Sequence, residues 1–262
     1  MSDPFNILLK TTAENPIHKA NIGLINRSGK YRIGNPSRPL IQHDNGHLDL
    51  HKSRYPTIAD RTRLAKWITK LEASELLCTS WSGKHLDTCN KEDLSDANAA
   101  YRHFLFGKGS DRKFDYERFL KNDPSAADLI KNVTSDFKKH VEIIGMDRVN
   151  FSVTSDAYTI GRDGIAPYPS TANWQKTLGA HFLWVSANIA VTVDSTLAIC
   201  YHADMKLHAE DRYNFNPGAT DIATGIPDSE NGLFEITGLA HQYTQFSTIS
   251  RNCIWRSGKR EK

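Results

Sequence analysis

The stretch CYHADMKLHAEDRYNFNPGATDIATGIPD, residues 200–228, decides how the rest of the chain is organised. From Ile199 to Glu210 apolar side chains hold one parity and polar side chains the other. A period of two over this length predicts a half-buried β-strand with one face on a core and one face in water. The alternation breaks at Asp211, and the Asn, Pro and Gly residues that follow predict a turn. The strand therefore ends in acids, amides and a phenol, on a support rigid enough to hold reactive groups.

The composition is that of an ordinary globular protein. The chain has 262 residues, of which 39% are hydrophobic and 24% are charged, enough for one domain or for one domain with a smaller lobe. The net charge of +3 is too small to indicate a nucleic-acid partner, and no segment approaches the ~18 consecutive apolar residues of a membrane span. The start, MSDPFNILLK, lacks the pattern of a secretory signal. We therefore expect a protein that is made in the cytoplasm without a signal peptide and has no transmembrane segment.

The cysteines and histidines give no strong metal signature. The four cysteines are scattered and form no C-x-x-C pair, which argues against a zinc site, although Cys78 and Cys89 flank one expected loop and would be able to pair in an oxidising compartment. His43, His47 and His51 lie four residues apart, a spacing that would align them on a helix. The intervening Asp-Asn-Gly disfavours a helix, so we do not expect a metal site there.

Helices are expected in the first half of the chain and strands in the second. Helical periodicity with capping signals predicts helices over residues 57–77, 95–106, 123–144 and 232–243. Alternation predicts strands over residues 149–153, 178–193, 197–210 and 249–255, with the second and third paired through a turn at 194–196. This order predicts an α+β fold, with N-terminal helices packed on a C-terminal, mainly antiparallel sheet.

Three segments, in one order, carry a resemblance to a known family. They are AYRHFLFGKGSDR at residues 100–112, the long strand pair with Gly179-Ala180 near its start, and EDRYNFN at residues 210–216. Over roughly residues 95–258 the chain resembles the colicin M family, the bacteriocins that cleave lipid II. The resemblance implies a curved sheet like that of the colicin M catalytic domain. It implies a catalytic domain over residues 91–262 and an N-terminal extension over residues 1–90.

The resemblance also implies an activity and partners. The family hydrolyses lipid II, the undecaprenyl-pyrophosphoryl precursor of peptidoglycan, between the carrier and the pyrophosphoryl group, with the help of Mg²⁺. It acts at the outer face of the inner membrane, and the resemblance implies a cognate immunity protein. The first ninety residues do not resemble the family's receptor-binding and translocation part. We therefore expect delivery by a secretion apparatus, such as type VI, into the periplasm of a target bacterium.

The resemblance places the reaction on the turn after residue 210. Asp211 and Tyr213 match active-site positions of the family, and Asn214 stands where the family has a second Asp. The family's His-Arg pair falls here on Thr220-Asp221, a departure that removes a base and a cation. This leaves open whether other residues take over or the site has lost its activity.

Phosphoester hydrolysis needs a base that activates water and positive charge on the phosphoryl oxygens. We expect Asp211 and Asp221, with an amide from Asn214 or Asn216, to hold Mg²⁺ through oxygen ligands. The candidate catalytic residues are Asp211, Tyr213, Asn214, Asp221 and, as the base, His208. The candidate substrate-binding residues are Arg112, Arg212 and Asn216.

Each candidate also has a purely structural interpretation. Asp211 would cap a turn, Tyr213 would belong to the core, the asparagines would shape the turn, and His208 would be a solvated strand residue. The competing function is a non-enzymatic or catalytically altered effector that binds an anionic lipid headgroup or the membrane. The chain shows no long apolar helix of the kind that a pore-forming toxin hides.

Overall fold

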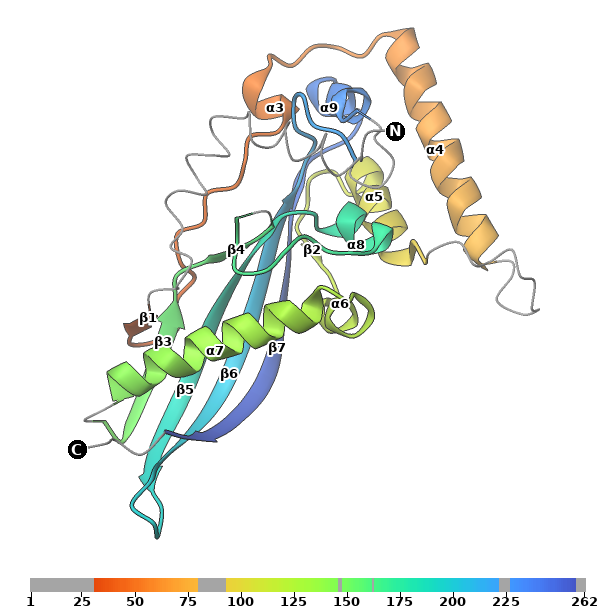
Figure 1. Ribbon diagram of the computed structural model, residues 1–262. Coiled ribbons are helices and arrows are strands. Elements are labelled where there is room, and N and C mark those ends of the chain that lie inside the picture. The colour runs from red at the N-terminus through yellow and green to blue at the C-terminus, as the bar shows by residue number, and fades with distance from the viewer. Residues whose placement is uncertain (1–30, 80–92, 146–147, 162, 222–226, 258–262) are drawn as a thin grey trace.

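A long, curved sheet forms the centre of the molecule (Figure 1). The structure is a computed structural model that describes residues 31–79, 93–145, 148–161, 163–221 and 227–257. Its strands are β1 (Tyr31–Ile33), β2 (Arg112–Lys113), β3 (Asn150–Ser155), β4 (Tyr158–Ile160), β5 (His181–Val193), β6 (Ile199–Tyr213) and β7 (Tyr243–Arg256). The order across the sheet is β1-β3-β5-β6-β7-β2, with β4 also on β5, and all pairs are antiparallel except β2 with β7. The predicted α+β class with a mainly antiparallel sheet is confirmed.

The helices occupy one face and one end of this sheet. They are α3 (His47–Leu50), α4 (Ile58–Thr79), α5 (Ser95–Phe106), α6 (Tyr116–Asn122), α7 (Ala126–Ile144), α8 (Ala172–Thr177) and α9 (Ser229–Ile236). Figure 1 shows α7 crossing one face, whereas α3, α5, α8 and α9 gather near one end. α4 packs against α5 and α9. Within the described residues, no helix is both long and apolar enough to cross a bilayer.

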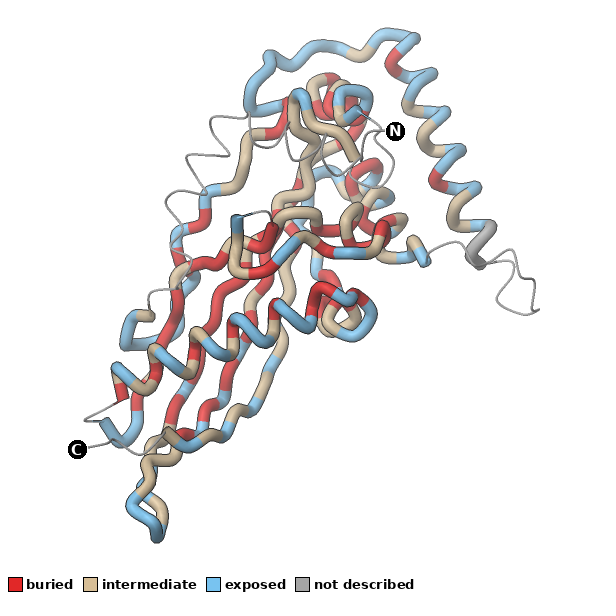
Figure 2. Tube along the Cα trace, viewed as in Figure 1, coloured by how far each residue is buried: buried red, intermediate tan, exposed pale blue. Residues whose placement is uncertain are grey.

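The main core lies between α7 and the sheet, as the two periodicities predicted. Val133, Phe137 and Val141 of α7 are fully buried, as are Val185 of β5 and Ala209 of β6. Each large apolar side chain buried in this way contributes about 1.5–3 kcal/mol. Figure 2 shows buried residues along the central strands and exposed residues at the β5–β6 hairpin. The core therefore holds the central strands in place, including the C-terminal part of β6.

β6 is longer than its alternation predicted. The predicted break at Asp211 was wrong, because the strand continues to Tyr213 and the turn begins at Asn214. The reason is the partner strand: Asp211 pairs with Gln245, and Tyr213 pairs with Tyr243. Asp211 is therefore a strand residue and does not cap a turn.

The helix predicted over residues 232–243 was also wrong in extent. α9 ends at Ile236, and Gly238 follows with a φ of +66°, a left-handed conformation that glycine adopts readily and that ends a helix. The chain is thereby released into β7 at Tyr243, six residues before the predicted strand. This early start is what extends the pairing of β6.

Segments predicted as loops contain short elements. α8 and β4 lie within residues 156–177, for which the sequence pattern indicated a loop, and Trp174 of α8 is buried. Cys200 and Cys253 are free thiols. Cys89, the expected partner of Cys78, and the domain boundary expected at residue 90 lie outside the described residues.

Residues 34–56, which we call the strap, connect the sheet edge to the end that carries the site. The side chain of Arg38 forms an ion pair with Glu210, and Nε2 of His43 lies within hydrogen-bond distance of the same carboxylate, at 2.8 Å. The backbone N–H of His47 donates to the carbonyl of Phe215 at 3.0 Å, and the N–H of Arg54 donates to the carbonyl of Ile236 at 3.1 Å. The strap therefore packs directly against the turn after β6 and against the end of α9.

Candidate active site

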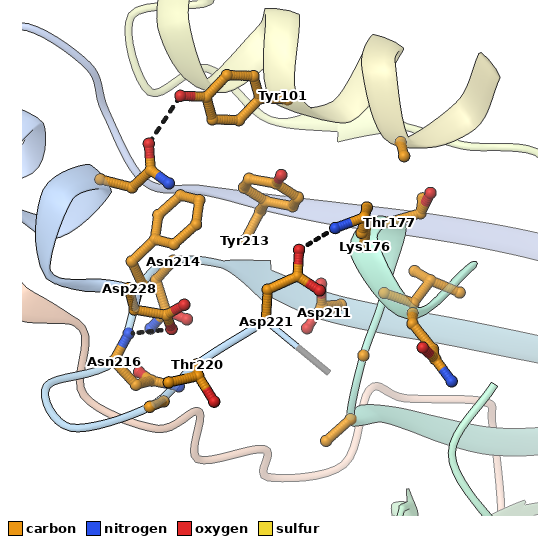
Figure 3. A pocket seen from close by; sticks show the side chains of 18 of the residues that line it. Tyr101, Lys176, Thr177, Asp211, Tyr213, Asn214, Asn216, Thr220, Asp221 and Asp228 are labelled. Carbon is orange, nitrogen blue, oxygen red and sulfur yellow. Dashed lines mark hydrogen bonds and ion pairs between the residues drawn. The ribbon is translucent and has the colours of Figure 1, made fainter. Parts of the chain in front are cut away.

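A cavity of about 370 Å³ lies at the end of β6, between α4, α5, α8 and the turn that follows the strand (Figure 3). This size is within the range of small-molecule sites. Six candidate residues from the sequence line it, namely Asp211, Arg212, Tyr213, Asn214, Asn216 and Asp221. The cavity therefore gathers most of the predicted set in one place.

Asp211 is the buried acid of this cavity, with 7% of its surface exposed. Its Oδ2 accepts a hydrogen bond of 2.9 Å from Nε2 of Gln245, whose Oε1 accepts one of 2.9 Å from Arg112. Burial raises the pKa of the Asp211 carboxyl well above its ordinary value, and the nearby charge of Asp44 adds to the rise. Arg112 thus touches Gln245 and not Asp211, and it does not line the cavity. The sequence analysis missed Gln245 because it lay in a segment without a predicted strand.

Asp221 is paired with a cation that the sequence analysis also missed. Nζ of Lys176, on α8, donates a hydrogen bond and forms an ion pair with Oδ2 of Asp221, and both residues line the cavity (Figure 3). Lys176 lies within the segment predicted as a loop, where no sequence motif marked it as a site residue. It places a positive charge beside Asp221.

Asp228 is a third acid on the cavity wall, just before α9. Burial raises its pKa to about 6, with a further rise from the charge of Asp44, against the hydrogen bond of 3.0 Å that it accepts from the backbone N–H of Asn216. A pKa near neutrality suits a group that exchanges protons. The sequence offered one signal for Asp228, its place at the end of the organising stretch.

Asp44 of the strap completes the polar side of the cavity. Its carboxylate accepts a hydrogen bond from Nδ2 of Asn216. The oxygen of the same amide, Oδ1 of Asn216, is buried and accepts no hydrogen bond. The side chain of Asn214 packs closely on Gly46 of the strap. A Cβ added to Gly46 would lie only 3.1 Å from the side chain of Asn214. The strap therefore forms a wall of the cavity.

Tyr213 combines a packing role with a place on the wall. Its ring stacks on Tyr243 with centroids 5.1 Å apart and meets Phe215 edge-on at 5.8 Å. Burial raises the pKa of its hydroxyl, so the group stays protonated and can donate. Arg212 also lines the cavity and forms an ion pair of 3.3 Å with Asp49.

His208 is not among the residues that line the cavity. Its ring stacks on Trp184 with centroids 5.0 Å apart, and its two nitrogens contact the hydroxyls of Ser186 and Thr248 at 2.9 and 3.0 Å. Because β6 continues past Asp211, residues 208 and 211 fall on opposite faces of the strand. His208 was expected to serve as the base because it lies three residues before Asp211, but that spacing directs the two side chains apart in a continuous strand. His208 is a packed strand residue.

The polar residues of the cavity are the candidate ligands for Mg²⁺. Among the described residues, no three His, Cys, Asp or Glu side chains gather into a ready-made metal site, which also leaves the histidine stripe of the strap without support. Mg²⁺, however, is commonly held by one or two carboxylates together with phosphate oxygens of the substrate. The buried Oδ1 of Asn216, without a partner, is the kind of oxygen that such an ion takes. Asp211, Asp221 and Asn216 line the same cavity, so their oxygens are the candidates to hold a magnesium ion that arrives with a phosphate.

Comparison with known proteins gives only weak similarity, and only to solved structures. No family model matches the chain, and no curated protein matches it. Among solved structures it is similar to PaeM, a colicin M-like bacteriocin produced by Pseudomonas aeruginosa, with 17% identity and a TM-score of 0.38. The match covers 63% of this chain and 52% of that one, so the chain spans about half the length of PaeM. At this TM-score the similarity does not establish a common fold.

Proposed function

We propose that this protein is an antibacterial toxin that hydrolyses lipid II and thereby blocks cell-wall synthesis. The observation that supports the proposal is the convergence of Asp211, Asp221 and Lys176 on one cavity, around the residues that resemble the colicin M motif. A cavity with acids of different protonation state and a paired lysine has the groups that phosphoester hydrolysis requires.

The roles follow from the electrostatics of each group. Asp228, with a pKa of about 6, is mostly ionised at neutral pH and can accept a proton from the attacking water. The ammonium of Lys176 can neutralise charge that develops on the phosphoryl oxygens, and the Tyr213 hydroxyl can donate to one of them. Asp228 thus takes the role that the sequence had assigned to His208.

Magnesium would be held by Asp211, Asp221 and Asn216. When bound, it would polarise the phosphoryl group and offset the charge of the surrounding acids. Gln245 would fix the orientation of Asp211, and Arg112 would fix Gln245. Removal of divalent ions with EDTA is expected to abolish hydrolysis, and added Mg²⁺ to restore it.

The direct test is incubation of the purified protein with lipid II and Mg²⁺, with the products separated by chromatography. Release of the polyprenol and the pyrophosphorylated disaccharide-peptide is the expected result. Binding without product would instead favour the second candidate, an effector that binds an anionic lipid headgroup. Neither binding nor product would contradict both.

Delivery and partners are part of the same proposal. A toxin that acts on lipid II at the outer face of the inner membrane should kill when it is expressed with a periplasmic leader and not when it is retained in the cytoplasm. We propose type VI-like delivery and a cognate immunity protein on the same basis. Equal killing from the cytoplasm would contradict a periplasmic target.

A further inference from the structure

The cavity has two unlike halves. One half carries the charged and amide groups described above, including Lys176, Asp221 and Asp228. The other half is formed by α4 and the start of α5 and combines apolar and aromatic residues with the polar Lys70, Ser74 and Asn98. Its apolar and aromatic lining residues are Trp67, Leu71, Leu94, Ala97 and Tyr101. We call this second half the α4 wall.

The α4 wall is held in place by specific contacts. Nε1 of Trp67 donates a hydrogen bond of 2.8 Å to Glu230 at the start of α9. Leu71 is buried in a cluster with Phe104 and Phe234. Arg102 of α5 forms an ion pair with Glu75 of α4. α4 is therefore a fixed side of the cavity, although it precedes the region that carries the family resemblance.

An apolar wall that faces an acidic and amide floor across one cavity fits an amphipathic ligand. The ring of Trp67 lies 5.9 Å from that of Tyr101, and the two rings present an aromatic surface with the ammonium of Lys70 4.1 Å from the centre of the Trp67 ring. A purely polar ligand would leave this surface exposed to water. A purely apolar ligand would leave the polar floor without partners.

We propose that the α4 wall binds the isoprenoid chain of the substrate next to its pyrophosphate. This inference rests on the proposed function and adds to it a binding site for one part of the substrate. A cavity of about 370 Å³ has room for the head and the first isoprene units only, so the rest of the chain lies outside it. α4 is then a determinant of lipid specificity, and the polar floor is the site of reaction.

The test compares two non-hydrolysable heads by calorimetry in the presence of Mg²⁺. One probe is farnesyl-phosphonyl phosphate, in which carbon replaces the oxygen that joins the chain to phosphorus. The other is methyl-phosphonyl phosphate, which has the same head without the chain. The full-length protein should bind the farnesyl probe at least about 10-fold more tightly than the methyl probe, because each buried methylene favours binding.

Variants of Trp67 locate the effect. Trp67→Ala should weaken binding of the farnesyl probe about 10-fold and leave the methyl probe unchanged. Trp67→Phe, which loses the hydrogen bond to Glu230 but keeps an apolar ring, should retain most of the preference. Leu94→Ser tests the same wall without altering α4. Ile58→Ser is the control, because Ile58 lies on α4, is 86% exposed and does not line the cavity.

Three results separate this inference from the proposed function. Equal affinity for the two probes, or an equal loss of both in Trp67→Ala and Leu94→Ser, would overturn the α4 wall as the chain site. A Trp67-dependent preference for the farnesyl probe without cleavage of lipid II would retain the wall and overturn the hydrolysis. Failure to bind either probe, together with cleavage of lipid II, would overturn the wall as the chain site and retain the hydrolysis.

Discussion

Glu210 and Asp211 are neighbours in β6, are almost equally buried, and lie in opposite electrostatic surroundings. Burial alone would raise the pKa of both. At Glu210 the hydrogen bonds from Arg38 and His43 outweigh burial and lower the pKa to about 2. At Asp211 the partner is the neutral amide of Gln245, so burial prevails and the pKa is raised. The difference separates an acid that joins the strap to the sheet from an acid that faces a cavity and is available for chemistry.

The largest expected effect comes from replacing the acids that line the cavity. Asp211→Ala and Asp221→Ala should each reduce killing by a periplasm-directed protein about 10²–10⁴-fold, because each removes an oxygen from the reaction centre. Killing is measured by colony counts after induction, with the level of folded protein as the control. A folded Asp211→Ala variant that kills like the wild type would remove the catalytic role of this acid.

Replacement of the cation on the cavity side should have the next largest effect. Lys176→Met is expected to lower the rate of lipid II cleavage about 10²-fold, since it removes the positive charge beside the phosphoryl group. Lys176→Arg keeps the charge and should recover part of the rate. If methionine and arginine give the same rate, the positive charge of Lys176 has no part in the reaction.

Replacement of Glu210, the acid that contacts the strap, should change the stability of the protein and not the rate of cleavage. Glu210→Gln is expected to lower the free energy of unfolding by about 1–3 kcal/mol, because it breaks a buried pair whose arginine is half exposed. Urea unfolding at pH 7 measures the loss. Since the pKa of Glu210 falls from 4.5 to about 2 on folding, the difference from the wild type should disappear as pH falls from 4.5 towards 2. A difference that persists at pH 2 would contradict the assignment.

A smaller effect of opposite sign is expected at Asp228. Its pKa rises from 3.8 to about 6 on folding, so the folded protein binds this proton more tightly than the unfolded chain. Its stabilising contribution is complete below pH 3.8 and is lost as pH rises to about 6. Relative to Asp228→Asn, the wild type should lose about 2 kcal/mol over that range, with allowance for partial exposure. Parallel stability curves for the two proteins would exclude the raised pKa.

Periodicity predicted the fold class and most of the elements, because the core depends on a repeated pattern of apolar side chains. The helix at α5, the α7 stripe and the β5–β6 pair all follow from it. The C-terminal ends of β6 and α9 do not follow from periodicity. The end of β6 depends on a partner strand that begins at Tyr243, and the end of α9 depends on the left-handed conformation of Gly238. Local sequence does not encode a partner thirty residues away.

The site was predictable where a motif marked it and not where the fold brought residues together. Asp211, Asn216 and Asp221 were found from the organising stretch and the resemblance. Lys176, Gln245 and Asp44 come from three other segments and carry no local signal. His208 was misassigned because it lies three residues before Asp211, and in a continuous strand that spacing places its side chain on the other face.

The measurement that tests the account most directly is the initial rate of lipid II cleavage by Asp211→Asn and Glu210→Gln beside the wild type, at a temperature where all three are folded. The account predicts that Asp211→Asn loses at least about 10²-fold in rate, whereas Glu210→Gln remains within a few-fold of the wild type. Equal losses in the two variants, or a normal rate in Asp211→Asn, would contradict the claim that the reaction takes place on the cavity side of β6.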